Sequence, residues 1–127
     1  MKDIENNALF WQKLDTLFMS SKIVINRPIG QKHEVYPSLV FPVDYGYIKD
    51  TSGTGSEAVD IFVGKNKADK VQAIAVSTDI LRKNIEVKLI VGCDEEEVQL
   101  ILEFLNSMEF QKALLIRRGN VVPEWIE

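Results

Sequence analysis

Proline and glycine residues break the first half of this chain into short pieces. Pro28, Gly30, Pro37 and Pro42 lie close together, and proline cannot donate a backbone hydrogen bond inside a helix or a central strand. Residues 28–42 therefore cannot hold a long regular element. A glycine-rich loop at residues 51–56 interrupts the chain again. The fold has to be assembled largely from short strands joined by turns.

Apolar patterns outside these breaks predict two helices and several strands. Residues 3–19 form the first helix, with its apolar side chains on one face. The second helix begins after Asp94, a good N-cap, and Glu97 completes a capping box. Alternating or short apolar runs predict strands at residues 22–26, 58–63, 71–76, 85–91 and 113–116. The apolar face of the first helix consists of Leu9, Phe10, Leu14, Leu17 and Phe18.

This order of elements predicts an α+β fold, in which two helices cover a small twisted sheet or barrel. Short strands joined by turns favour a partly closed barrel, because closure removes exposed strand edges. The length of 127 residues predicts one domain that spans residues 1–127.

Composition excludes several classes of site and partner. Cys93 is the only cysteine, so an internal disulfide and a cysteine-rich zinc site are excluded. We interpret Cys93 as a small buried apolar side chain, since a catalytic thiol would need His33, the only histidine. The net charge of −4 argues against nucleic acid as the main partner.

The chain also lacks the marks of a membrane or secreted protein. No apolar run approaches the ~20 residues that cross a bilayer, and the first residues do not resemble a signal peptide. We expect a cytoplasmic protein with no membrane partner. The apolar face of the first helix serves either for internal packing or for contact in a homo-oligomer.

The strongest candidate for chemistry is Asp60, which interrupts the apolar run 58–63. A buried carboxylate must be paired, hydrogen-bonded or bound to a cation. A salt bridge and a functional role are both open on residue type alone. Glu57 lies three residues earlier, so in a regular strand it would point to the opposite face. The two carboxylates converge only if Glu57 still lies in the bend that leaves the loop.

Other charged and aromatic residues admit the same two interpretations. Glu86 and Lys88 share one face of their strand, as a plain ion pair or as part of a phosphate site. Tyr45 either packs in the core or offers its hydroxyl to a phosphate oxygen. Arg117 either lies in solvent or binds phosphate through its two-pronged guanidinium.

Together these side chains offer hard oxygen ligands and cations. Oxygen ligands suit Mg²⁺ or Mn²⁺ better than zinc. The chemistry that they indicate is metal-assisted transfer of a phosphoryl group to water.

Three segments carry a resemblance to a known family. Residues 41–48 resemble its Tyr-Pro-x-(Asn/Asp)-Tyr-Gly-Tyr segment, residues 57–61 the end of its Asp-x-Asp-x-x-Asp signature, and residues 86–91 its Asp-x-Lys-Leu-Val strand. Lys32 and Glu34 resemble the Lys-x-Glu pair of its substrate loop. Over residues 22–92 the chain resembles the Mg-dependent family I inorganic pyrophosphatases, and its short length resembles a compact bacterial branch.

The resemblance implies hydrolysis of pyrophosphate or another small phosphate compound by an OB-like five-stranded barrel with flanking helices. It implies that Glu57, Asp60 and Glu86 bind Mg²⁺ and that Glu57 and Asp60 act in catalysis. It also implies that Lys32, Glu34, Tyr45 and Lys88 contact the substrate. Arg117, proposed above from its residue type, completes the predicted substrate site.

Four positions depart from the family pattern. Gly55, Asn26 and Asn84 stand where the family has carboxylates, and Phe41 replaces a tyrosine. Each lost carboxylate weakens metal affinity. Two hypotheses follow: a hydrolase of altered rate or substrate, and a non-catalytic module that binds a phosphate compound or serves a structural role.

Overall fold

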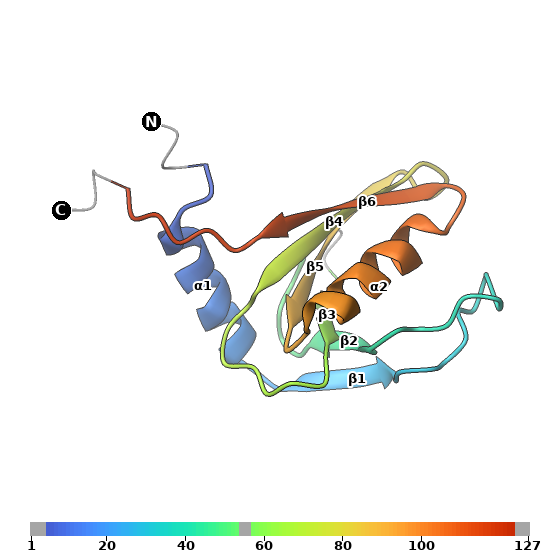
Figure 1. The fold of residues 1–127 in the computed structure, drawn as a ribbon, viewed down its shortest axis with the longest axis horizontal. Helices are drawn as coiled ribbons and strands as arrows, with labels where there is room; N and C mark the ends of the chain where they lie inside the picture. The colour runs from blue at the N-terminus through green and yellow to red at the C-terminus, as the bar shows by residue number, and fades with distance from the viewer. Residues whose placement is uncertain (1–4, 54–56, 124–127) are drawn as a thin grey trace.

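Two helices lie on opposite faces of one mixed sheet (Figure 1). The computed structural model describes residues 5–53 and 57–123. The expected α+β class with two helices is confirmed. In chain order the elements are α1 (Ala8–Met19), β1 (Ile23–Arg27), β2 (Asp44–Ile48), β3 (Val59–Val63), β4 (Ala73–Asp79), β5 (Asn84–Val91), α2 (Glu95–Asn106) and β6 (Gln111–Arg117).

The sheet has six strands in the order β1-β2-β3-β5-β4-β6. Only β3 and β5 pair in parallel; the other pairs are antiparallel. Across the described residues no pairing joins β1 to β6, so the expected five-stranded barrel is here an open six-stranded sheet. The additional strand is β2, which falls within the aromatic segment 41–48. It is a strand because β1 and β3 pair with its two edges.

Helix α1 begins later than predicted, and its buried face is rotated. The side chain of Asn7 caps the helix by accepting the backbone N–H of Phe10 at 3.1 Å. Trp11 and Phe18 are buried, whereas Phe10 is 49% exposed. The predicted start at residue 3 lies outside the described residues, and Glu5 and Asn6 are not helical. The sequence pattern missed Trp11 as the main anchor of this helix.

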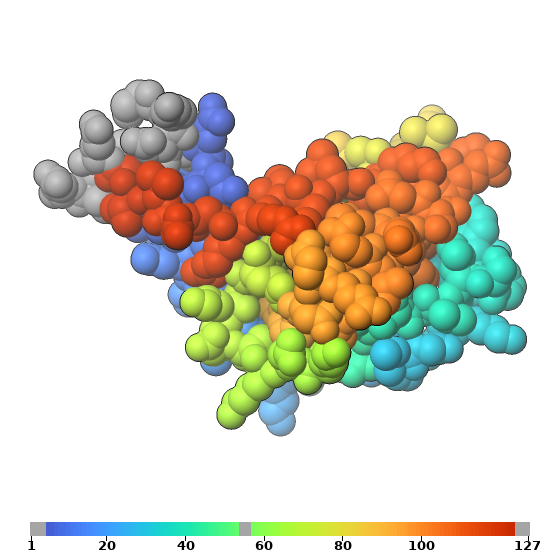
Figure 2. Space-filling view, viewed as in Figure 1, coloured from blue at the N-terminus to red at the C-terminus, as the bar shows by residue number. Residues whose placement is uncertain are grey.

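Helix α2 begins as predicted. The Asp94 side chain accepts the N–H of Glu97 at 2.8 Å, and the Glu97 side chain accepts the N–H of Asp94 at 3.1 Å. Phe104 of this helix meets Phe41 with ring centroids 4.7 Å apart. In Figure 2, α2 accordingly lies beside the 28–42 segment. Neither helix of the described chain is long and apolar enough to cross a membrane.

Each helix covers its own apolar cluster. On one face, α2 packs against Phe41, Phe62 and Ile90. On the other face, α1 packs Trp11 and Phe18 with buried strand residues such as Ile61 and Leu89. Both faces of the sheet are therefore partly buried. A polar side chain of a central strand that faces α2 lies beside the apolar cluster under that helix.

Gly46 allows β1 and β2 to approach. A Cβ atom at this position would overlap the backbone carbonyl oxygen of Val24 in β1. β1 cannot move away from β2 without breaking the backbone hydrogen bonds between the two strands, so only glycine fits at this position.

We expect Gly46→Ala to lower the free energy of unfolding by about 2 kcal/mol, in the range of other overpacking changes. Urea denaturation measures the loss. Gly53→Ala is the control, since its added Cβ would find its nearest neighbour, the Glu57 carbonyl oxygen, at an ordinary 3.6 Å. Equal effects of the two changes would contradict this account of Gly46.

Candidate phosphate-binding site

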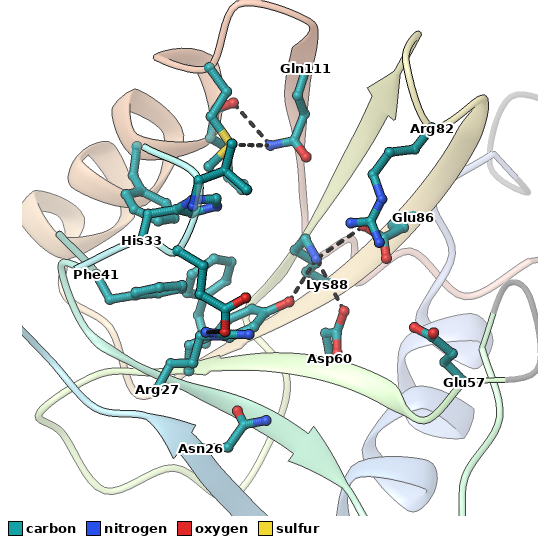
Figure 3. Close-up of a pocket in the computed structure, with 17 residues that line it drawn as sticks. Asn26, Arg27, His33, Phe41, Glu57, Asp60, Arg82, Glu86, Lys88 and Gln111 are labelled. Carbon is teal, nitrogen blue, oxygen red and sulfur yellow. Dashed lines mark hydrogen bonds and ion pairs between the residues drawn. The ribbon is translucent and has the colours of Figure 1, made fainter. Parts of the chain in front are cut away.

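A cavity of about 450 Å³ opens on the α2 side of the sheet (Figure 3). Its apolar part includes the rings of Phe41, Phe62 and Phe104. The charged side chains on its wall are Arg27, Glu34, Glu57, Asp60, Arg82, Glu86 and Lys88. Four carboxylates and three cations thus line one hollow, together with the Tyr45 hydroxyl.

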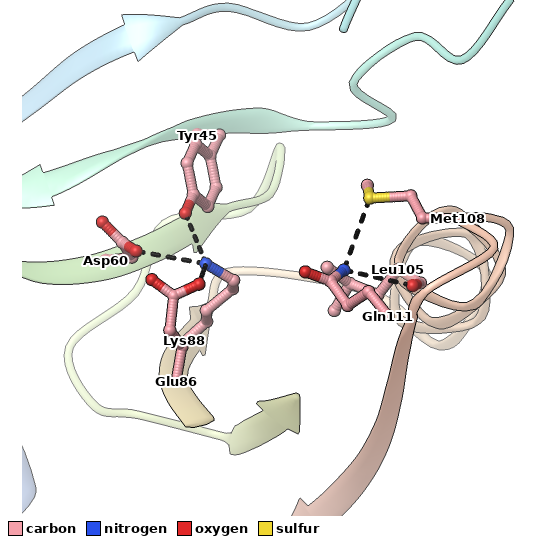
Figure 4. Close-up of polar contacts among 7 residues, drawn as sticks. All are labelled: Tyr45, Asp60, Glu86, Lys88, Leu105, Met108 and Gln111. Carbon is pink, nitrogen blue, oxygen red and sulfur yellow. Dashed lines mark hydrogen bonds and ion pairs between the residues drawn. The ribbon is translucent and has the colours of Figure 1, made fainter. Parts of the chain in front are cut away.

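Lys88 is the centre of the polar network (Figure 4). Its ammonium donates to the Tyr45 hydroxyl oxygen at 2.7 Å, to Asp60 Oδ2 at 3.1 Å and to Glu86 Oε1 at 3.5 Å. The Lys88 side chain is 7% exposed, whereas Asp60 and Glu86 retain 28% and 24%. An ammonium has three N–H donors, and all three have an acceptor here.

The sheet register brings these groups together. Asp60 in β3 lies beside Lys88 in the parallel strand β5, and Glu86 is on the same face of β5 two residues earlier. Tyr45 pairs with Phe62 of β3, two residues after Asp60, and therefore faces the same side. The ion pair of Glu86 with Lys88, one of the two interpretations of these residues, is present, and the Asp60 carboxylate is paired with the same ammonium.

Burial sets the protonation of the network. It raises the pKa of the Tyr45 hydroxyl well above the ordinary value of 10.0. Burial also disfavours the Lys88 ammonium, but Tyr45, Asp60 and Glu86 outweigh it, so the pKa of Lys88 is raised above 10.5. At neutral pH the cavity therefore holds a neutral phenol and a charged ammonium.

Glu57 and Glu34 lie on the cavity wall but outside the Lys88 network. Glu57 lies two residues before the start of β3, and its side chain is exposed. Figure 3 shows it beyond Asp60, away from Lys88. Glu34 bonds the Arg27 guanidinium at 2.7 Å and is 70% exposed. Of the predicted site residues, Tyr45, Asp60, Glu86 and Lys88 are thus in direct contact.

Lys32 and Arg117 do not line the cavity. Lys32 is exposed in the 28–42 segment, where it bridges Val40. Arg117 ends β6, at the edge of the sheet, and its guanidinium bonds Glu95 Oε1 and Oε2 at 2.6 and 3.0 Å. Glu95 is the first residue of α2, whereas Phe104 in the cavity lies near the C-terminal end of that helix. The ion pair therefore holds Arg117 at the opposite end of α2 from the cavity.

Sequence reasoning missed Arg27 as a cavity residue. A register shift between Ile25 and Arg27 makes a β-bulge in β1, and bulges redirect side chains. Arg27 lies over the Phe41 ring, 5.9 Å from its centroid. A strand alternation cannot reveal a bulge, so no signal in the sequence marked this arginine.

Arg82 was missed as well, because a lone arginine in a turn usually lies in solvent. The Asp79 side chain accepts the N–H groups of Leu81 and Arg82, both at 3.0 Å, and fixes the β4–β5 turn. Figure 3 shows the Arg82 side chain reaching toward Glu86. Within residues 5–53 and 57–123 its guanidinium has no hydrogen-bond or ion-pair partner.

His33 and Cys93 have structural roles. His33 Nδ1 accepts the N–H groups of Val35 and Tyr36, and burial lowers the pKa of its imidazole. Cys93 is buried, and burial raises the pKa of its thiol to about 12. The Cys93 thiol is therefore not poised to act as a nucleophile at neutral pH, and two backbone N–H groups already occupy Nδ1 of His33.

The carboxylates do not form a ready-made metal centre. Among the described residues, no three His, Cys, Asp or Glu side chains gather to hold a metal ion. Asp60 and Glu86 instead share the Lys88 ammonium. Of the three predicted metal ligands, Asp60 and Glu86 thus meet at one cation, whereas Glu57 lies apart from them.

Two of the four departures from the family pattern, Asn26 and Phe41, line the same cavity. Asn26 lines it with an amide, and Phe41 is buried beneath it at 5% exposure. Asn84 lies at the start of β5, near the β4–β5 turn. Gly55 lies outside the described residues.

No protein-family model and no curated protein matches the chain by sequence. Solved structures with a similar fold are an inorganic pyrophosphatase from Coxiella burnetii, at TM-score 0.57 and 11% identity, and one from Helicobacter pylori, at 0.55 and 14%. An inorganic phosphatase from Anaplasma phagocytophilum follows at 0.51 and 13%. The matches cover 75% of this chain and 84%, 81% and 81% of those chains. The chain has a pyrophosphatase-like fold.

Removing the ammonium should leave two neighbouring carboxylates without a counter-charge. We expect Lys88→Met to lower the free energy of unfolding by about 2 kcal/mol, less than for a fully buried pair because both carboxylates keep contact with water. Urea denaturation measures the loss. Lys65→Met removes an exposed partner of Asp94 and should have little effect. If Lys88→Met were as stable as the wild type, Lys88 would not be the residue that holds this network together.

Alkaline pH should weaken the fold through the same network. Stability from a raised pKa is present below the unfolded-state value and is lost as pH rises through the folded-state value. Both Tyr45 and Lys88 have raised pKa values, so the free energy of unfolding should fall above about pH 10. Urea denaturation of the wild type and of Tyr45→Phe at several alkaline pH values tests this prediction. If the free energy of unfolding of the variant fell as steeply with pH, the Tyr45 hydroxyl would not contribute to the effect.

Proposed function

We propose that this cavity binds a small phosphate compound and hydrolyses its phosphoanhydride bond, with inorganic pyrophosphate as the first substrate to test. The observation that carries the proposal is the contact of Tyr45, Asp60 and Glu86 with one buried ammonium. The pyrophosphatase-like fold supports it.

Lys88 is the proposed phosphate ligand. A phosphate oxygen that takes one acceptor place on its ammonium would displace a carboxylate, because the three N–H donors are already used. Arg82 and the Tyr45 hydroxyl would hold further phosphate oxygens. Their cationic and hydrogen-bonding groups would stabilise the charge that develops on the leaving phosphate.

Asp60 is the proposed base, and Glu57 is proposed to assist it. Asp60, released from Lys88, would accept the proton of a water molecule as the water oxygen attacks phosphorus, and Glu57 would help to orient that water. The bridging P–O bond breaks, and its electron pair leaves with the departing phosphate. Glu86 would balance the charge on Lys88 throughout.

The excess of negative charge on the cavity wall favours a substrate whose own negative charge is partly neutralised. Four carboxylates exceed the three cations on its wall, so a bare phosphate anion is repelled. A Mg²⁺ ion bound to the incoming phosphate compound would remove this repulsion. We therefore propose a dependence on Mg²⁺ that enters as part of the substrate. A cytoplasmic location and a homo-oligomeric assembly stay predictions from sequence.

Asp60→Asn tests the hydrolysis. With pyrophosphate and Mg²⁺, we expect wild type to release phosphate and the variant to be slower by about 100-fold, since a positioned base contributes 10²–10⁴-fold. A colorimetric phosphate assay measures the rate. Arg117→Ala, which removes a charge away from the cavity, should keep the wild-type rate. Equal rates for wild type and Asp60→Asn would refute the proposed catalytic role.

Binding without turnover is the second candidate. The amide of Asn26 on the cavity wall and the lack of a three-ligand cluster among described residues favour it. This hypothesis predicts that pyrophosphate raises the melting temperature while no phosphate is released.

A further inference from the structure

A second, larger hollow opens beside the cavity. Its volume is about 760 Å³, and it lies along the hairpin that joins β4 to β5. Glu57, Arg82 and Glu86 line both hollows. The two spaces therefore meet at the charged groups that we assign to phosphate chemistry.

The second hollow has the surface of a site for an organic group. Ile80 and Ile85, which line it, are 69% and 55% exposed, and covering such apolar surface is favourable. Thr78, Asp79 and Asn84 add hydrogen-bonding groups to its wall. Mixed apolar lining with a few polar groups is usual in small-molecule sites.

The edge of β5 adds backbone groups to the same place. β3 pairs with β5 only from Lys88 onward, whereas β5 begins at Asn84. Over the part of the chain that the structure describes, the β5 edge before Lys88 thus has no neighbouring strand on this side. Backbone N–H and C=O groups there can bond a ligand's polar edge.

Arg82 stands where the two hollows meet. Its guanidinium has no hydrogen-bond or ion-pair partner among the described residues, although Asp79 fixes its backbone. A guanidinium can hold phosphate and can stack on a flat ring. One side chain at this boundary can thus contact both parts of a phosphate ester.

We propose that the preferred ligand is an organic phosphoanhydride, with its phosphates in the first cavity and a flat, nucleoside-sized group against Ile80 and Ile85. The inference rests on the proposed function, because the phosphates must bind at Lys88. Inorganic pyrophosphate would fill the first cavity and leave the second empty. Both hollows fall within the roughly 300–1,000 Å³ of small-molecule sites.

Calorimetric titration of the full chain with pyrophosphate and with ADP, each with Mg²⁺, tests the proposal. We expect ADP to bind at least about 10-fold more tightly, the lower end for one added apolar contact in a pocket. Ile85→Thr should weaken ADP binding by a similar factor and leave pyrophosphate binding unchanged.

Leu114→Thr is the matched control. Leu114 is 56% exposed, close to the 55% of Ile85, but lies on β6 away from the hollow. Its substitution should change neither affinity. Tight pyrophosphate binding without a preference for ADP, or equal effects of the two substitutions, would overturn this inference alone. Failure of both ligands to bind would overturn the proposed function with it.

Discussion

A lysine ammonium in a protein core requires acceptors for its three donors, and this requirement organises the α2 side of the sheet. Lys88 meets it with Tyr45, Asp60 and Glu86, which come from β2, β3 and β5. The parallel pairing of β3 with β5 sets Asp60 beside Lys88. Pairing of β2 with β3 adds Tyr45. The register of three neighbouring strands is thus tied to the satisfaction of one charge.

The ion pairs of Lys88 connect the stability of the fold with the proposed phosphate chemistry. A buried ion pair gains little net stability, because desolvation offsets the attraction. A ligand that offers Lys88 a phosphate oxygen can therefore replace a carboxylate at modest cost. The carboxylate that it frees becomes available to a water molecule. The Lys88 side chain is only 7% exposed, so charge–charge interactions at its ammonium are stronger than they would be in open water.

Local sequence signals predicted the parts of the structure that depend on neighbours in the chain. The Asp94–Glu97 capping box and the shared face of Glu86 and Lys88 are both of this kind. The sequence did not predict features that depend on contacts between residues far apart in the chain. β2 became a strand because β1 and β3 flank it, and Arg27 turned into the cavity at a bulge. Arg117 pairs with Glu95 and does not line the cavity, since the placement of α2 over β6 is a tertiary feature.

The central claim is that phosphate binds at the Lys88 network. Titration of isotopically labelled protein with pyrophosphate and Mg²⁺, followed by heteronuclear NMR, tests it most directly. The account predicts that the largest chemical-shift changes occur at Tyr45, Asp60, Glu86 and Lys88, with much smaller changes around Arg117 and Glu95. Saturable shifts that cluster elsewhere on the sheet, or no shifts at all, would contradict it.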